Sequence, residues 1–247
     1  VNPYPTHFIQ WLKKPMMAPA LLFFPIMALG IHFKDSDQSR TTFFEDYTNT
    51  ALQSIEPNSL LITQQWDFLI PPYYYLRTVE NKYPNLMVLA KELVRRSWYV
   101  NKQAVLLDSG IFSGAQAEKE LFLQNLKPFE ENGPYDGNQI ELSYQGLLGK
   151  IMTEQLKRRP VYLGLECIQN DGVKIPAGYR LVPVGFWMKL VPASEGYVPA
   201  KIPQFKPNFP ANWTGKGDAG YYADFIKTMW NGSCQNRAQY EASFGKN

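Results

Sequence analysis

Two groups of polar and aromatic side chains each follow a short apolar run, and their residue types are suited to binding a ligand. Gln64, Gln65 and Asp67 follow the run LLIT at 60–63, and a second group follows LMVLA at 86–90. A carboxylate beside arginines and aromatic rings suits a sugar or a phosphate, because rings stack on sugars and guanidinium groups clamp phosphate oxygens. The candidate ligand-binding residues are Trp66, Asp67, Lys91, Glu92, Arg95, Arg96, Trp98 and Tyr99.

Both groups depend on the preceding runs for their position. Each run has the length and composition of a buried strand, and Pro71-Pro72 between them is typical of a first helical turn. Another helix is predicted over 36–55, before the first run. The order helix, strand, helix, strand predicts an α/β fold with a small, mainly parallel sheet and flanking helices. Because the carboxyl ends of adjacent parallel strands lie at one edge of a sheet, we expect the two groups to meet there.

The roles of these residues follow from their charges. Asp67 or Glu92 would accept hydrogen bonds from sugar hydroxyls, and Arg95 and Arg96 would face a phosphate or carboxylate. The alternative is a structural network of ion pairs with aromatic packing, and the spacing alone leaves both interpretations open. No catalytic residue is assigned.

Several other kinds of chemistry are excluded by the composition. His7 and His32 lie outside the predicted domain, and no G-x-S-x-G motif is present, which argues against a serine or cysteine hydrolase. Cys167 and Cys234 have no metal-ligand spacing around them, so the sequence predicts no metal site and no cofactor. Outside the cytoplasm these cysteines could form a disulfide; the alternative is two free thiols in the core. The net charge of +3, with acids and bases interspersed, gives no support for nucleic-acid binding.

Further elements are predicted downstream. The apolar stripe over 144–155 predicts a helix that ends at Arg159-Pro160. The runs at 161–166 and 181–191 predict a third and a fourth strand. Ser113 and Gln116 form an S-x-x-Q pattern that predicts a capping box for the following helix.

An apolar block near the start of the chain predicts a membrane helix. Residues 15–33 carry no formal charge and include one histidine, and a helix of this length is ~28 Å long, close to the hydrocarbon thickness of a bilayer. Pro19 and Pro25 would break a soluble helix but are tolerated in a membrane helix. A buried core segment and a retained signal peptide are the alternatives.

The charges around the block predict its orientation. Lys13 and Lys14 precede it, which by the positive-inside rule places them in the cytoplasm and the later residues in a periplasm or lumen. The predicted organisation is a cytoplasmic segment at 1–14, a transmembrane helix at 15–33 and an extracytoplasmic α/β domain at 34–191. Residues 192–247 follow as a proline-rich strap and C-terminal helices.

The segment QQWDFLIPPYYYLRTVENKYPNLMVLAKELVRRSWYV at 64–100 resembles the C-terminal region of a bacterial multi-pass membrane family. That family is related to the eukaryotic transmembrane protein O-mannosyltransferase. The resemblance continues in RRPVYLGLE at 158–166 and in YRLVPVGFWMKLVP at 179–192, and it covers most of residues 15–191. Where many family members read G-D-N-D after the first strand, this chain reads Gln64-Gln65-Trp66-Asp67, so only Asp67 matches.

The resemblance implies a glycosyltransferase of the GT-C class with a lipid-linked sugar donor. In such proteins the catalytic acid lies in an early extracytoplasmic loop, before the region matched here, so it cannot be carried over to this chain. The chain is therefore expected to be a membrane-anchored domain of a glycosyltransferase-like protein that binds sugar or acceptor without the catalytic loop. The alternative is a non-catalytic accessory subunit of a larger membrane complex. The expected partners are the lipid bilayer, other membrane subunits and a lipid-linked sugar.

Overall fold

The computed structural model describes residues 17–36, 42–102, 110–169, 172–202, 205 and 218–245. The chain divides into two compact units, residues 1–42 and residues 43–247, and each is described by itself. The second unit includes the residues after Pro192 together with the sheet and its helices.

The first unit contains one described helix, α2 (Met17–Ser36). Side chains are described from Leu22 to Phe33, and all of them are exposed. Pro25 lies inside the helix. The apolar block predicted to be helical is therefore a helix over most of its length. Among the residues that the structure describes, no helix is long and apolar enough to cross a membrane.

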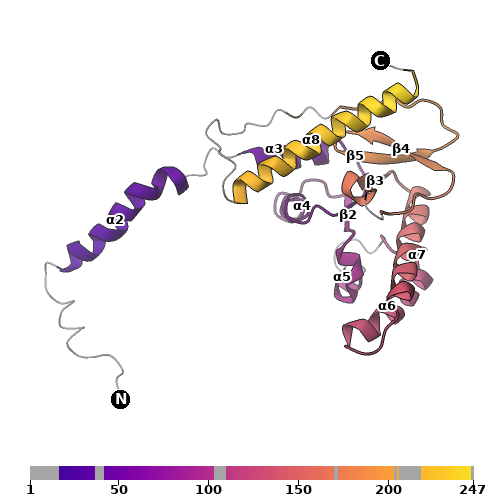
Figure 1. Ribbon diagram of the computed structural model, residues 1–247, viewed down its shortest axis with the longest axis horizontal. Coiled ribbons are helices and arrows are strands. Elements are labelled where there is room, and N and C mark those ends of the chain that lie inside the picture. Colours follow the sequence, from indigo (N-terminus) through magenta and orange to yellow (C-terminus); the bar gives the residue numbers. More distant parts are fainter. Residues whose placement is uncertain are drawn as a thin grey trace. The chain divides into compact units, whose positions relative to one another are not determined.

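A mixed five-stranded sheet forms the centre of the second unit, in the order β2-β1-β3-β5-β4 (Figure 1). β1 pairs in parallel with both β2 and β3, whereas β5 pairs antiparallel with both β3 and β4. The predicted α/β class is confirmed, but a mainly parallel sheet is wrong for the β3-β5-β4 half. The strands are β1 (Leu60–Thr63), β2 (Met87–Ala90), β3 (Val161–Gly164), β4 (Tyr179–Val184) and β5 (Trp187–Pro192).

The run predicted as a single strand at 181–191 is in fact a hairpin. The turn between β4 and β5 contains Gly185, whose φ of +64° is in the left-handed region that favours glycine. A Cβ at Gly185 would also stand 2.5 Å from the Cβ of Ser54. Val184 and Phe186 on either side are buried, so the apolar pattern runs through the turn without a polar break. One glycine was the only sequence signal for the reversal.

Helices surround the sheet. In Figure 1, α3 and α8 lie on one side of the strands and α6 and α7 lie on the other. The aromatic rings of Phe44 on α3 and Tyr222 on α8 meet edge to face with centroids 5.5 Å apart. The helices are α3 (Phe43–Gln53), α4 (Ile70–Thr78), α5 (Ser97–Lys102), α6 (Gln116–Glu130), α7 (Gly137–Leu156) and α8 (Asp218–Ser243), with short 3-10 turns η1 (Leu93–Arg95) and η3 (Leu165–Cys167).

Helix α7 confirms its predicted apolar stripe, but the predicted cap of α6 is wrong. The stripe residues from Tyr144 to Gln155 are buried, and Asp136 caps the helix by accepting from the amides of Asn138 (2.9 Å) and Gln139 (3.2 Å). The residue before α6 has no capping side chain. The Ser113 hydroxyl instead accepts a hydrogen bond from Arg158 at 2.8 Å, because the neighbouring helix end offers a charged donor.

The described part of the proline-rich segment packs against α8. The Tyr240 hydroxyl donates to the carbonyl of Val198 at 2.8 Å, and the Glu241 carboxylate accepts from the amide of Ala200 at 3.1 Å. Most of residues 203–217 lie outside the described residues. Cys167 is buried and Cys234 is exposed, and both are free thiols. The possibility of a disulfide is therefore wrong, and the alternative of two thiols in the core is right only for Cys167.

The turn at Gly185 gives a test of the hairpin. Gly185→Ala should lower the free energy of unfolding by about 2 kcal/mol or more, because the new Cβ meets both the unfavourable φ and Ser54. Gly178→Ala also has a positive φ, +82°, but open space around the new Cβ, so it should cost about 1 kcal/mol. Gly196→Ala has neither constraint and serves as the control. Denaturant unfolding measures all three, and equal losses at Gly185 and Gly196 would show that the turn places no demand on residue 185.

Candidate functional site

The carboxylate of Glu166 connects the ends of two central strands. Glu166 follows β3. Its carboxylate accepts hydrogen bonds from the Thr63 hydroxyl (2.6 Å), the Gln64 backbone amide (3.0 Å) and the Gln65 side-chain amide (3.3 Å), all at the end of β1. Three neutral donors therefore satisfy this carboxylate. Sequence analysis did not select Glu166 because it made Glu166 the last residue of the strand predicted at 161–166, whereas β3 ends at Gly164.

A glycine makes room for this arrangement. Gly164 ends β3, and a Cβ there would stand 2.0 Å from the Oε1 atom of Glu166. The carboxylate thus folds back over the last residue of its own strand. Any larger residue at 164 would displace the carboxylate from its partners.

Tyr47 extends the same network to helix α3. Its hydroxyl donates to the Oε1 atom of Gln65 at 2.5 Å, and both side chains are buried. Burial, with a smaller contribution from the negative charge of Glu166, raises the pKa of the Tyr47 hydroxyl far above its usual value, so it stays protonated as a donor. Gln65 therefore links α3 to Glu166, a structural role that leaves neither end of its side chain for a ligand.

Gln64 joins the polar groups that follow β1 and β2. Its side-chain amide donates to the Oε1 atom of Glu92 at 3.0 Å. Lys91 lies 3.3 Å from the same oxygen, and the Nε atom of Arg95 lies 3.4 Å from the other carboxylate oxygen. The prediction that parallel pairing brings the two groups together is confirmed for these residues.

Besides Glu92, two residues of α7 hold the guanidinium of Arg95 in place. Its guanidinium pairs with Glu141 on α7, at 2.6 Å between Nη1 and Oε2 and 3.4 Å between Nη2 and Oε1. It also lies over the ring of Tyr144, with 3.9 Å from Cζ to the ring centroid. The hydrogen bond from Arg95 lowers the pKa of Glu141 below its usual value, so both groups are charged at neutral pH. Arg95 is thus a fixed positive group at the sheet edge.

A pocket of about 270 Å³ opens beside Arg95 and Arg96; we call it the arginine pocket. Phe129 and Tyr135, from the end of α6 and the loop after it, form an edge-to-face pair with centroids 5.0 Å apart. Arg96 is exposed, and within the part of the chain that the structure describes its side chain makes no hydrogen bond or ion pair. The pocket is lined by Arg95, Arg96, Leu126, Phe129, Tyr135, Gly137, Ile140 and Glu141.

The other predicted residues lie in different surroundings. Trp66 and Asp67 are exposed just after β1 and do not line the arginine pocket, and Trp98 is exposed on α5. Tyr99 is buried, and its hydroxyl accepts from the amide of Ala90 at 2.9 Å, which gives it a structural role. Lys91 is also buried, and its carbonyl accepts from the Tyr144 hydroxyl at 2.9 Å.

The pocket residues that sequence analysis missed come from α6, the loop after it and α7. Phe129, Tyr135 and Glu141 follow no strand, so the rule that ligands bind at the carboxyl ends of strands gives no signal for them. Only the packing of α6 and α7 beside η1 brings them to Arg95 and Arg96.

The described residues contain no group of three or more His, Cys, Asp or Glu placed to hold a metal ion. No protein-family model, curated protein or solved structure matches the chain.

The Glu166 arrangement can be tested with a double-mutant cycle. Gly164→Ala and Glu166→Ala should each destabilise the protein by about 1–3 kcal/mol, because hydrogen-bonding groups at the end of β1 lose their acceptor. In the Glu166→Ala background, Gly164→Ala should cost much less, because the atom it displaces is gone. Gly149→Ala, where a Cβ meets nothing, is the control. Additive losses in denaturant unfolding would mean that Gly164 does not serve the carboxylate.

Proposed function

We propose that the chain is a membrane-anchored, extracytoplasmic domain of a glycosyltransferase-like protein, and that it binds a phosphorylated sugar without transferring it alone. The arginine pocket is the observation that carries the ligand part of this proposal. It combines the guanidinium of Arg96, which has no partner among the described residues, with the aromatic pair of Phe129 and Tyr135. Arg96 would bind the phosphate and an aromatic face would stack on the sugar ring.

The fixed pair of Arg95 and Glu141 supports the same ligand class. Because Arg95 is already neutralised by Glu141, its guanidinium supplies position more than free charge. Glu141 lines the pocket with its side chain about half exposed, so its carboxylate oxygens are accessible to sugar hydroxyls. A ligand with one anionic group and several hydroxyls fits this distribution better than a dianion without hydroxyls.

The size of the pocket favours a small ligand group. Its volume of about 270 Å³ lies just below the range of roughly 300–1,000 Å³ that is usual for small-molecule sites. One sugar ring with its phosphate, exposed at one side, suits this space better than a long glycan. A lipid-linked sugar would place only its head group there, and its lipid chain would remain outside.

Helix α2 supports the membrane part of the proposal. From Leu22 to Phe33 its side chains are exposed, apolar for the most part and without formal charge, with His32 as the one titratable group. An exposed helix with apolar side chains on every face is unfavourable in water. We propose that the block at 15–33 lies in a bilayer, with residues 43–247 in a periplasm or lumen.

The arginine pocket makes a prediction for ligand binding. In the full chain, isothermal titration with mannose 1-phosphate should show binding that Arg96→Gln weakens about tenfold, because one charge-assisted contact is lost. Tyr135→Leu should weaken binding of mannose 1-phosphate and of mannose itself, because stacking does not need the phosphate.

Arg158→Gln is the matched control, since it removes a surface guanidinium that does not line the pocket. Arg95→Ala is a poor test variant, because it also leaves Glu141 unpaired and is expected to destabilise the fold. If Arg158→Gln and Arg96→Gln reduce affinity equally, the binding is general charge attraction and the proposed site is wrong.

The membrane proposal predicts how substitutions in α2 act. Ile26→Lys combined with Leu29→Lys should release the chain from membranes into the soluble fraction after carbonate extraction, because a lysine at the centre of a membrane helix costs about 3 kcal/mol. Leu121→Lys combined with Leu142→Lys, at two exposed leucines of the second unit, should leave the chain in the membrane fraction. Wild-type protein that is fully extracted by carbonate would contradict the anchor.

A further inference from the structure

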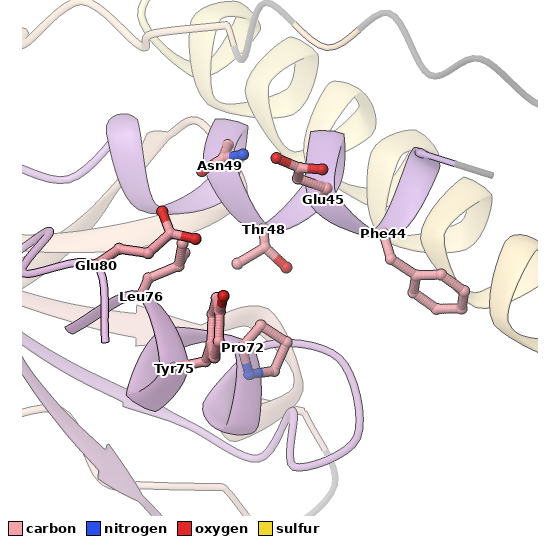
Figure 2. Close-up of a pocket in the computed structure, with 8 residues that line it drawn as sticks. All are labelled: Phe44, Glu45, Thr48, Asn49, Pro72, Tyr75, Leu76 and Glu80. Carbon is pink, nitrogen blue, oxygen red and sulfur yellow. The ribbon is translucent and has the colours of Figure 1, made fainter. Parts of the chain in front are cut away.

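A second pocket lies between α3 and α4, and we call it the acidic pocket (Figure 2). It has a volume of about 390 Å³. Residues of α3 line one side and residues of α4 line the other, with Glu80 just after the end of α4. None of its lining residues belongs to the arginine pocket or to the network around Glu166.

Apolar and aromatic groups form one part of the wall. Tyr75 and Pro72 lie together on α4, with Leu76 beside them, and Phe44 lies on α3 (Figure 2). The Tyr75 side chain is 54% exposed, so its ring is accessible to a ligand. These groups provide a surface for the apolar body of a ligand and one ring for contact with a cation.

The charge in the acidic pocket is negative. Glu45 and Glu80 both line it, and neither a lysine nor an arginine is among its described lining residues. Glu80 has a basic neighbour, because Lys82 lies 2.7 Å from its carboxylate. Glu45 makes no hydrogen bond or ion pair within the part of the chain that the structure describes, but its charge, like that of Glu80, helps to raise the pKa of Lys82. Two carboxylates therefore share one basic neighbour, and the local charge of the pocket remains negative.

The two helices that form the pocket are firmly placed. The Thr48 hydroxyl of α3 donates to the carbonyl of Phe68, just before α4, at 3.2 Å. The Tyr73 hydroxyl of α4 donates to the carbonyl of Leu86, and prolines occupy the first turn of α4. A ligand would therefore meet a preformed pocket, and little binding energy would be lost to ordering it.

From this combination we infer that the acidic pocket binds a small organic cation, an ammonium group carried on an aromatic or alkyl body. The carboxylate of Glu45 would receive the ammonium group, Glu80 would add a second negative charge, and Tyr75 would contact the body of the ligand and face the cation. An anion would meet two carboxylates, with Lys82 outside the lining as the base that both of them share. This inference is independent of the sugar-phosphate proposal, since the two pockets share no residue.

The inference is tested with a charged ligand and its neutral counterpart. Titration of the full chain with 2-phenylethylamine, followed by protein NMR, should show binding at least about tenfold tighter than that of 2-phenylethanol. Glu45→Gln and Tyr75→Leu should each weaken the binding of the amine about tenfold. Lys82→Met should strengthen it a few-fold, because Lys82 competes with the ligand for Glu80.

Glu120→Gln is the matched control, an exposed carboxylate on α6 that does not line the pocket. The melting temperature of each variant is compared with that of the wild type, and an unchanged value shows that the variant is folded. Equal binding of the amine and the alcohol would overturn the inference, because the pocket would then select only an apolar body. An equal loss with Glu120→Gln and Glu45→Gln would also overturn it, as would absence of binding at about 10 mM amine.

Discussion

The hydrogen bonds of the Glu166 carboxylate are the interaction on which the central architecture depends. A partly buried carboxylate such as Glu166 is costly unless donors surround it, and here three donors come from the three consecutive residues Thr63, Gln64 and Gln65. The carboxylate therefore fixes the direction in which the chain leaves β1 relative to the end of β3. Through Gln65 the same group reaches Tyr47 on α3 and the sulfur of Met229 on α8. Helices from both ends of the second unit are thus tied to one acidic side chain.

This arrangement also decides which polar groups remain for a ligand. Both ends of the Gln65 side chain are hydrogen-bonded, to Tyr47 and to Glu166. The Gln64 side chain instead donates to Glu92, after β2. Glu92 contacts Arg95, and Arg95 is neutralised by Glu141 on α7. The structural ion-pair interpretation therefore holds for most of this edge. The exception is Arg96, one residue further along, which is exposed, lines the arginine pocket and has no partner among the described residues.

The sequence was sufficient to predict those strands and helices whose position depends on a local pattern of residues. The runs at 60–63 and 86–90 predicted β1 and β2, and parallel pairing then predicted the meeting of Gln64 with Glu92. The reversal at Gly185 was missed because its neighbours Val184 and Phe186 are buried and apolar. The polar residues that usually mark a hairpin turn are therefore absent at this turn. Tyr99 was misplaced because nothing in its spacing distinguishes a ring that stacks on a ligand from one buried beneath β2. Phe129 and Tyr135 depend on long-range packing of α6 and α7, which no short pattern encodes.

The two pockets have the same kind of lining, an aromatic ring and a charged side chain, but the charge is positive at Arg96 and negative at Glu45. An exposed tyrosine and a charged side chain line each pocket, Tyr135 and Arg96 in one and Tyr75 and Glu45 in the other. The net charge of the chain is only +3, so its overall field does little to distinguish anions from cations. Salt reduces the reach of each charge to about 8–10 Å, which confines it to its own pocket. Selection by sign must therefore come from local contacts, and a ring beside a net local charge can recognise both the body of a ligand and its charge.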